Sequence, residues 1–148
     1  MNPAGFIRVS AISTSTHVGN PKRNASQIQR ALDSLVSSDI VLLPELALSG
    51  YTCGELFLQD RLLESCLESL VELATGVGQQ LVVLGLPLAV EGCLFNVAAV
   101  LGSGTVLGLV PKTHLPNYGE FYEARWFHSG AQADFDTVDL DGIGQVPF

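Results

Sequence analysis

The chain has 148 residues, which is enough for one compact domain. Its 15 acidic residues outnumber its 7 basic ones, and the resulting formal net charge of -8 disfavours a nucleic-acid partner, which needs clustered lysine and arginine. Hydrophobic residues make up 47% of the chain and charged residues only 15%, a composition typical of strands that are buried on both faces of a sheet.

Neither a membrane span nor a targeting segment is expected. The longest apolar run, Leu81 to Val90, contains glycine and proline and is shorter than the roughly 18 residues that a spanning helix needs. The amino terminus lacks a basic stretch followed by an apolar one, so we expect a cytoplasmic location and no membrane partner. Three cysteines without metal-ligand spacing indicate reduced thiols rather than a disulfide framework.

The predicted elements alternate between strands and helices in the first half of the chain. Hydrophobic spacing predicts three strands and two amphipathic helices, in the order strand 6–13, helix 22–36, strand 39–43, helix 59–77 and strand 81–86. Two further strands, 94–101 and 106–110, flank Gly102-Ser-Gly-Thr105 and predict a hairpin. A long loop over 113–129 precedes two short strands, 133–140 and 142–148. This order predicts a mixed sheet with helices packed on it.

Two charged residues stand directly after buried strands. Glu45 follows Val-Leu-Leu-Pro, and Lys112 follows Leu-Val-Pro. Open α/β sheets bind their ligands at the carboxyl ends of strands, where partial burial raises the pKa of a carboxylate toward the range of a general base. A lysine beside such a carboxylate can donate to a developing oxyanion. The spacing fits solvated charges at strand ends equally well, so both interpretations stay open from the pattern alone.

The 113–129 loop carries Glu120 and Glu123 close to the aromatic residues Phe121, Tyr122, Trp126 and Phe127. Such a loop is typical either of a functional segment or of a small aromatic cluster with its acids outside. Tyr51 lies six residues after Glu45, and Tyr118 lies six residues after Lys112. Each tyrosine could line a pocket or simply pack against neighbouring side chains.

Cys53 is the candidate nucleophile within this chain because it lies in a loop near Glu45. It lacks the strand-to-turn setting that presents a reactive thiol. Cys66 falls on the apolar face of the second predicted helix, and Cys93 precedes a strand, so both are predicted to be structural.

Together these segments resemble the nitrilase (carbon–nitrogen hydrolase) superfamily, and more narrowly the amino-terminal glutaminase domain of glutamine-dependent NAD(+) synthetases. Leu-Pro-Glu45-Leu and Pro-Lys112 carry the resemblance at the level of the superfamily. The segments 49–57, SGYTCGELF, and 112–127, KTHLPNYGEFYEARWF, carry the narrower one. The resemblance covers about residues 6–127 and implies an α/β fold, the nitrilase-type α-β-β-α sandwich, of which residues 1–148 form the first half only.

The resemblance implies a Glu–Lys–Cys triad, with Glu45 as the general base and Lys112 stabilising the tetrahedral intermediates. Glu120 matches an additional glutamate that orients the site, Tyr118 matches a residue that lines the glutamine pocket, and Tyr51 is expected nearby. The cysteine attacks the side-chain amide of L-glutamine, releases ammonia and forms a thioester, from which water frees glutamate.

The resemblance also implies parts that we expect outside this chain. The nucleophilic cysteine of the family lies on a strand-to-turn elbow well downstream of the lysine, so we expect it beyond Phe148, and we expect these 148 residues alone to be inactive. The synthetase domain, which uses ATP and Mg to amidate deamido-NAD, is expected elsewhere, so residues 1–148 form a partial glutaminase domain without a cofactor. The whole enzyme is expected to be a homo-oligomer.

Two other interpretations of the sequence stay open. The chain is either a catalytically inactive protein that keeps the fold for subunit contact, or a complete small domain that uses Cys53 as its nucleophile.

Overall fold

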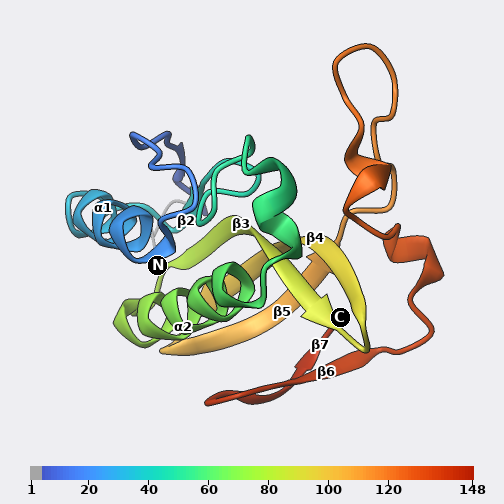
Figure 1. Cartoon of the computed structure of the whole chain (residues 1–148). Coiled ribbons are helices and arrows are strands. Elements are labelled where there is room, and N and C mark those ends of the chain that lie inside the picture. Colours follow the sequence, from blue (N-terminus) through green and yellow to red (C-terminus); the bar gives the residue numbers. More distant parts are fainter. Residues whose placement is uncertain (1–4) are drawn as a thin grey trace.

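A five-stranded mixed sheet with strand order β1-β2-β3-β4-β5 forms the centre of the computed structural model, which describes residues 5–148 (Figure 1). The strands are β1 (Val9–Ala11), β2 (Ile40–Leu42), β3 (Leu81–Val90), β4 (Cys93–Gly102) and β5 (Thr105–Pro111). β1, β2 and β3 are mutually parallel, whereas β4 is antiparallel to both β3 and β5. It follows that β5 runs in the same direction as β2.

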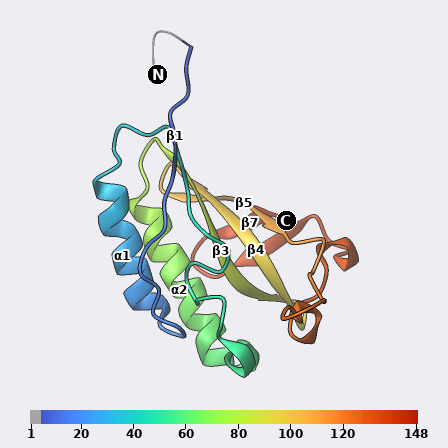
Figure 2. The ribbon, with the colours of Figure 1, turned by 90° about the horizontal axis from the view of Figure 1, so that it is seen from above.

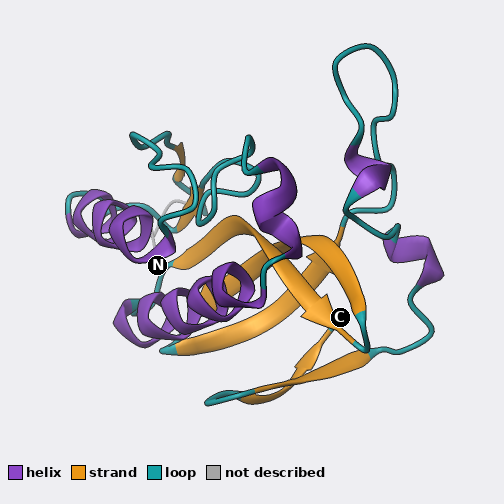
Figure 3. Cartoon of the chain, in the orientation of Figure 1, coloured by secondary structure: helices purple, strands orange, loops and turns teal. Residues whose placement is uncertain are grey.

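Two helices supply the crossovers that parallel strands require. α1 (Pro21–Asp33) connects β1 to β2, and α2 (Asp60–Gly76) connects β2 to β3. α1 begins where the side chain of Asn20 accepts the backbone N–H of Arg23 at 3.1 Å, with proline at the first helical position. Both helices lie on the same side of the sheet (Figures 2 and 3). Their buried stripes are Ala25, Ile28 and Leu32 in α1, and Leu62, Cys66, Leu70 and Leu73 in α2.

The two faces of the sheet differ in how completely they are covered. Val82, Leu84 and Leu86 alternate along β3 on one face and are fully buried. On the other face, Leu42 of β2 is 45% exposed and Val110 of β5 is 59% exposed. Part of an apolar sheet face therefore lies open to solvent.

A second, two-stranded sheet follows the long loop. β6 (Thr137–Leu140) and β7 (Gly144–Pro147) form an antiparallel hairpin. It is tied to the main sheet through Phe95 of β4, whose ring centroid lies 6.2 Å from that of Phe135 and 5.3 Å from that of Phe148. Because Phe95 pairs with Leu88, which shares a face with Leu86, this contact is made on the side that the helices also cover.

The predicted elements are present, although β1 is shorter than the strand predicted over 6–13 and β3 is longer than predicted. The sequence predicted that this strand ends at Leu86, before Pro87, but β3 continues to Val90 and forms a hairpin with β4 through Glu91 and Gly92, both with positive φ. Pro87 is tolerated because β2 ends at Leu42, opposite Val83, so that the proline has no strand beside its missing N–H. The short 3-10 turns η1 (Gly54–Leu58), η2 (Glu123–Arg125) and η3 (Gly130–Gln132) were not predicted.

None of the helices formed by residues 5–148 is long and apolar enough to cross a membrane.

Candidate active site

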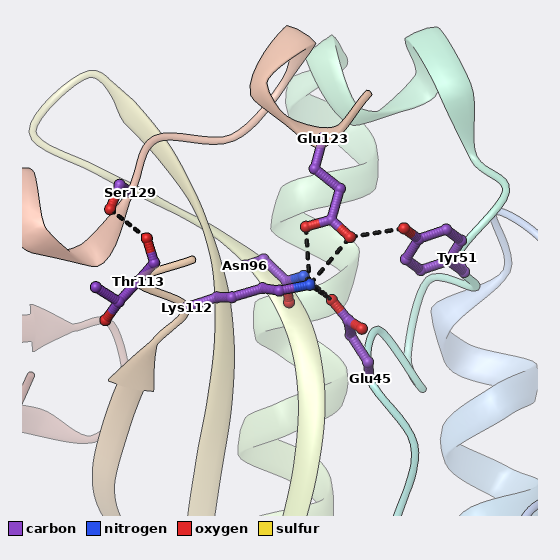
Figure 4. Close-up of polar contacts among 7 residues, drawn as sticks. All are labelled: Glu45, Tyr51, Asn96, Lys112, Thr113, Glu123 and Ser129. Atoms are coloured by element: carbon purple, nitrogen blue, oxygen red, sulfur yellow. Dashed lines mark hydrogen bonds and ion pairs between the residues drawn. The ribbon is translucent and has the colours of Figure 1, made fainter. Parts of the chain in front are cut away.

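The two strand-end charges meet at one edge of the sheet. Glu45 follows β2 and Lys112 follows β5, and since these strands run in the same direction, their carboxyl ends lie at the same edge. Nζ of Lys112 lies 2.7 Å from Oε1 of Glu45 (Figure 4). The pairing inferred from the resemblance is therefore present in the structure.

Gly85 of β3 lets the segment that carries Glu45 lie directly on the sheet. A Cβ at this position would stand 2.3 Å from the backbone nitrogen of Leu46 and 2.7 Å from Cα of Glu45, closer than any side chain permits. The contact is closed by two backbone hydrogen bonds, from Gly85 N to the carbonyl of Pro44 at 3.2 Å and from Leu48 N to the carbonyl of Gly85 at 3.3 Å. The absence of a side chain at Gly85 thus determines where Glu45 lies.

Lys112 has a second carboxylate partner, Glu123. Its Nζ lies 3.0 Å from Oε1 and 2.9 Å from Oε2 of Glu123. Partial burial lowers the pKa of Lys112, but the hydrogen bonds to Glu45 and Glu123 raise it by more, so the net pKa lies above 10.5. The lysine is therefore held as an ammonium between two carboxylates.

Glu123 is the buried member of this group, with 4% of its side chain exposed, whereas Glu45 keeps 42% of its side chain in contact with solvent. A buried carboxylate needs partners that replace water. Glu123 has two of them, the ammonium of Lys112 and the hydroxyl of Tyr51, which donates to Oε1 at 2.6 Å. Partial burial, this hydrogen bond and the charges of Glu123 and Glu45 raise the pKa of Tyr51 above its usual 10, so that the phenol stays a donor.

The 113–129 loop is fastened to the 51–58 segment beside the site. The ring centroid of Phe57 lies 5.7 Å from that of Trp126 and 5.0 Å from that of Phe127. Outside this aromatic cluster, Arg125 pairs with Glu55 at 2.7 Å. These contacts bring Glu123 back over the sheet edge, because η2 places it one turn before the anchored aromatic residues.

A cavity of about 520 Å³ opens beside the charged group. It is lined by Glu45, Lys112 and Asn96 of β4 and by the open apolar face of the sheet, which includes Leu42 and Val110. This volume is in the range of small-molecule sites. Among residues 5–148, no three His, Cys, Asp or Glu side chains are grouped to hold a metal ion.

The predicted site residues divide into two groups. Glu45, Lys112 and Tyr51 are brought together, although the hydroxyl of Tyr51 bonds Glu123. Tyr118 is 73% exposed, with its ring 6.0 Å from that of Phe121, and Glu120 is exposed without a hydrogen bond or ion pair to any described residue. The roles predicted for Glu120 and Tyr118 stay predictions.

Sequence reasoning missed the positions of Glu123 and Asn96 in the site. Glu123 was noticed as an acid in the loop, but nothing in an irregular loop indicates which of two glutamates turns inward. The sequence did offer an indication of Asn96, because it is a polar residue within the apolar run of β4, and a buried side-chain amide requires a hydrogen-bond partner.

None of the three cysteines lines this cavity. Cys53 is 5% exposed, and its Sγ donates to the carbonyl of Ser49 at 3.1 Å. Burial raises the pKa of the Cys53 thiol, and it raises that of Cys66, which is fully buried in α2, to about 12. Cys93 lies at the start of β4. A thiol poised to attack a ligand beside Glu45 is thus not found among the described residues.

The chain is similar to a group of longer enzymes. It is 40% identical over 143 residues to the glutamine-dependent NAD(+) synthetase of Mycobacterium tuberculosis, an alignment that covers 93% of this chain and 21% of that protein. The crystal structure of a glutamine-dependent NAD(+) synthetase from Cytophaga hutchinsonii superposes on 96% of this chain with a TM-score of 0.86 and 30% identity, and 25% of that chain is covered. By sequence, the chain is thus related to the glutamine-dependent NAD(+) synthetases.

A nitrilase-superfamily amidase from Nesterenkonia superposes on 94% of the chain with a TM-score of 0.69, and 53% of that chain is covered. At 24% identity this likeness shows the fold alone, a nitrilase-type α/β fold. No protein-family model matches the sequence. The chain spans about a fifth of the length of the curated relatives it matches.

Proposed function

We propose that this chain is the amino-terminal part of a glutaminase domain, which hydrolyses the side-chain amide of L-glutamine to glutamate and ammonia. In the proposed whole enzyme, a synthetase domain uses ATP and Mg to amidate deamido-NAD with that ammonia. The observation that carries the proposal is the Glu45–Lys112 pair in the lining of the cavity, in a chain similar to glutamine-dependent NAD(+) synthetases.

The geometry supports a division of roles between the two charges. Glu45 keeps 42% of its side chain exposed beside the cavity, so its carboxylate is accessible to the proton of a thiol. Lys112 stays protonated because two carboxylates flank it, and its ammonium is suited to stabilise the oxyanion that forms when the thiolate adds to the amide carbon. The proton taken up by the base then passes to the departing ammonia, and water hydrolyses the thioester.

The proposal includes a cysteine contributed from outside these 148 residues, because Cys53, Cys66 and Cys93 do not line the cavity. The open sheet face around Leu42 and Val110 is the surface on which a segment carrying that cysteine would pack.

The test compares this chain with an extended polypeptide, in which the same sequence is followed by the segment that carries the proposed cysteine. We expect the extended polypeptide to release glutamate and ammonia from glutamine, and we expect the 148-residue chain to release none. Glu45→Gln and Lys112→Ala should each abolish the activity. Lys22→Ala is the matched control, since Lys22 forms an exposed ion pair with Glu68 at 3.1 Å. Activity that survives both site substitutions would overturn the proposal.

A further inference from the structure

Asn96 touches both charged residues of the site through different groups. Its side-chain amide donates to Oε1 of Glu45 (Figure 4). Its backbone carbonyl accepts the N–H of Lys112 at 2.8 Å. The residue is 3% exposed and lies within β4, between the strands that precede Glu45 and Lys112. A single buried residue therefore binds the carboxylate of Glu45 and the backbone of Lys112.

The two donors that reach Glu45 converge on one of its oxygens. Oε1 accepts from both the amide of Asn96 and the ammonium of Lys112, the latter at 2.7 Å. No hydrogen bond from a residue within 5–148 reaches Oε2. Because an ionised carboxylate only accepts hydrogen bonds, Oε2 keeps its lone pairs available on a side chain that lines the cavity.

The hydrogen bond from Lys112 alone would not fix which oxygen of the Glu45 carboxylate is occupied and which is free. Its ammonium is shared with Glu123, and it sits on a flexible four-carbon stem. The terminal torsion of a glutamate is broad and nearly two-fold, so either oxygen could turn toward a mobile donor. A buried amide held by a strand acts from one fixed direction and keeps the carboxylate plane in one orientation.

We infer that Asn96 is a positioning residue that binds Oε1 of Glu45 and thereby leaves Oε2 as the atom that accepts the proton of the nucleophile. The inference rests on the proposed function for its chemistry, but the fixed orientation of Glu45 can be measured without any activity. Asn96 contacts no reacting atom in this scheme and acts through Glu45.

The first experiment uses NMR on the 148-residue chain. We expect one side-chain amide proton of Asn96 to resonate downfield and to exchange slowly with solvent, and both features to disappear in Glu45→Leu. In Asn96→Leu, the order parameter of the Glu45 side chain should fall. Asn24→Leu is the matched control, because Asn24 is a buried asparagine, 1% exposed, whose amide donates to backbone carbonyls of His17 and Leu48. An unchanged Glu45 order parameter in Asn96→Leu would overturn the inference.

The second experiment measures glutamine hydrolysis by the extended polypeptide. Asn96→Leu should lower kcat about 10- to 100-fold with little change in KM, as for a misplaced catalytic group. Asn96→Asp keeps the side-chain volume but replaces the donor with a group that ionises, so its residual rate should fall as pH rises. A residue that serves only stability would lower the rate equally in both variants at every pH and would match Asn24→Leu. If the unsubstituted polypeptide is inactive, the proposed function fails, and the NMR result alone decides the role of Asn96.

Discussion

The ammonium of Lys112 lies 2.9 Å from Oε2 of Glu123, a carboxylate that exposes only 4% of its side chain. Removing one charge of a buried pair is costly because the other charge is left without a partner. Here Lys112 keeps Glu45 as a second partner, at 2.7 Å. If the contact with Glu123 is removed, the ammonium of Lys112 therefore still has Glu45 as a partner.

Glu123→Gln should lower the pKa of Lys112 and reduce the free energy of unfolding by about 1–3 kcal/mol near pH 8, the usual value of a hydrogen bond to a charged group. The pKa of Lys112 is raised by folding, so its contribution is complete below pH 10.5 and is lost as pH rises through the folded value. The unsubstituted chain should accordingly lose more stability than Glu123→Gln as the pH rises above 10.5, as measured by urea unfolding. Glu68→Gln, which removes the exposed partner of Lys22, should change stability by less than about 1 kcal/mol. Equal pH dependence in the unsubstituted chain and Glu123→Gln would contradict the prediction.

Tyr51→Phe removes the 2.6 Å hydrogen bond to Glu123 and should cost about 1–2 kcal/mol of unfolding free energy. The loss should shrink when the substitution is made in Glu123→Gln, because the partner then carries no charge, and a double-mutant cycle measures this coupling. Tyr122→Phe is the control, since Tyr122 is 54% exposed and its hydroxyl bonds no described residue. Additive losses would show that the hydroxyl of Tyr51 does not act through Glu123.

Gly85→Ala should destabilise the chain by about 1–3 kcal/mol, or more, because its Cβ would overlap the backbone of Glu45 and Leu46. The same displacement should lower glutamine hydrolysis by the extended polypeptide, since it moves the base. Gly78→Ala provides a control, because a Cβ at Gly78 meets no atom within 4 Å. Thermal unfolding of both variants tests this prediction, which fails if their midpoints agree.

The thiols should differ in their rate of alkylation by iodoacetamide. Cys53 and Cys66 are buried with raised pKa values, so both should react slowly, whereas the partly exposed Cys93 should react first. Mass spectrometry of partly modified protein identifies the order. Fast modification of Cys53, together with loss of any glutamine hydrolysis by the 148-residue chain, would instead support the interpretation that Cys53 is the nucleophile.

The sequence by itself determined the elements and the two strand-end charges. Helical periodicity identified α1 and α2, and short apolar runs identified the strands, because these patterns reflect which side of each element is buried. The pairing of Glu45 with Lys112 came from the resemblance of their motifs, and the parallel direction of β2 and β5 explains it.

Only the tertiary structure decided which other groups complete the site. Glu123, rather than Glu120, lies beside Lys112 because the aromatic anchors on Phe57 turn that part of the loop inward. Asn96 reaches Glu45 because β4 lies between β3 and β5, a strand order that no local pattern records. Both contacts join residues that are far apart in the chain. Their energies depend on the burial of single polar side chains, whereas the hydrophobic pattern of a sequence indicates only which face of a helix or strand is buried.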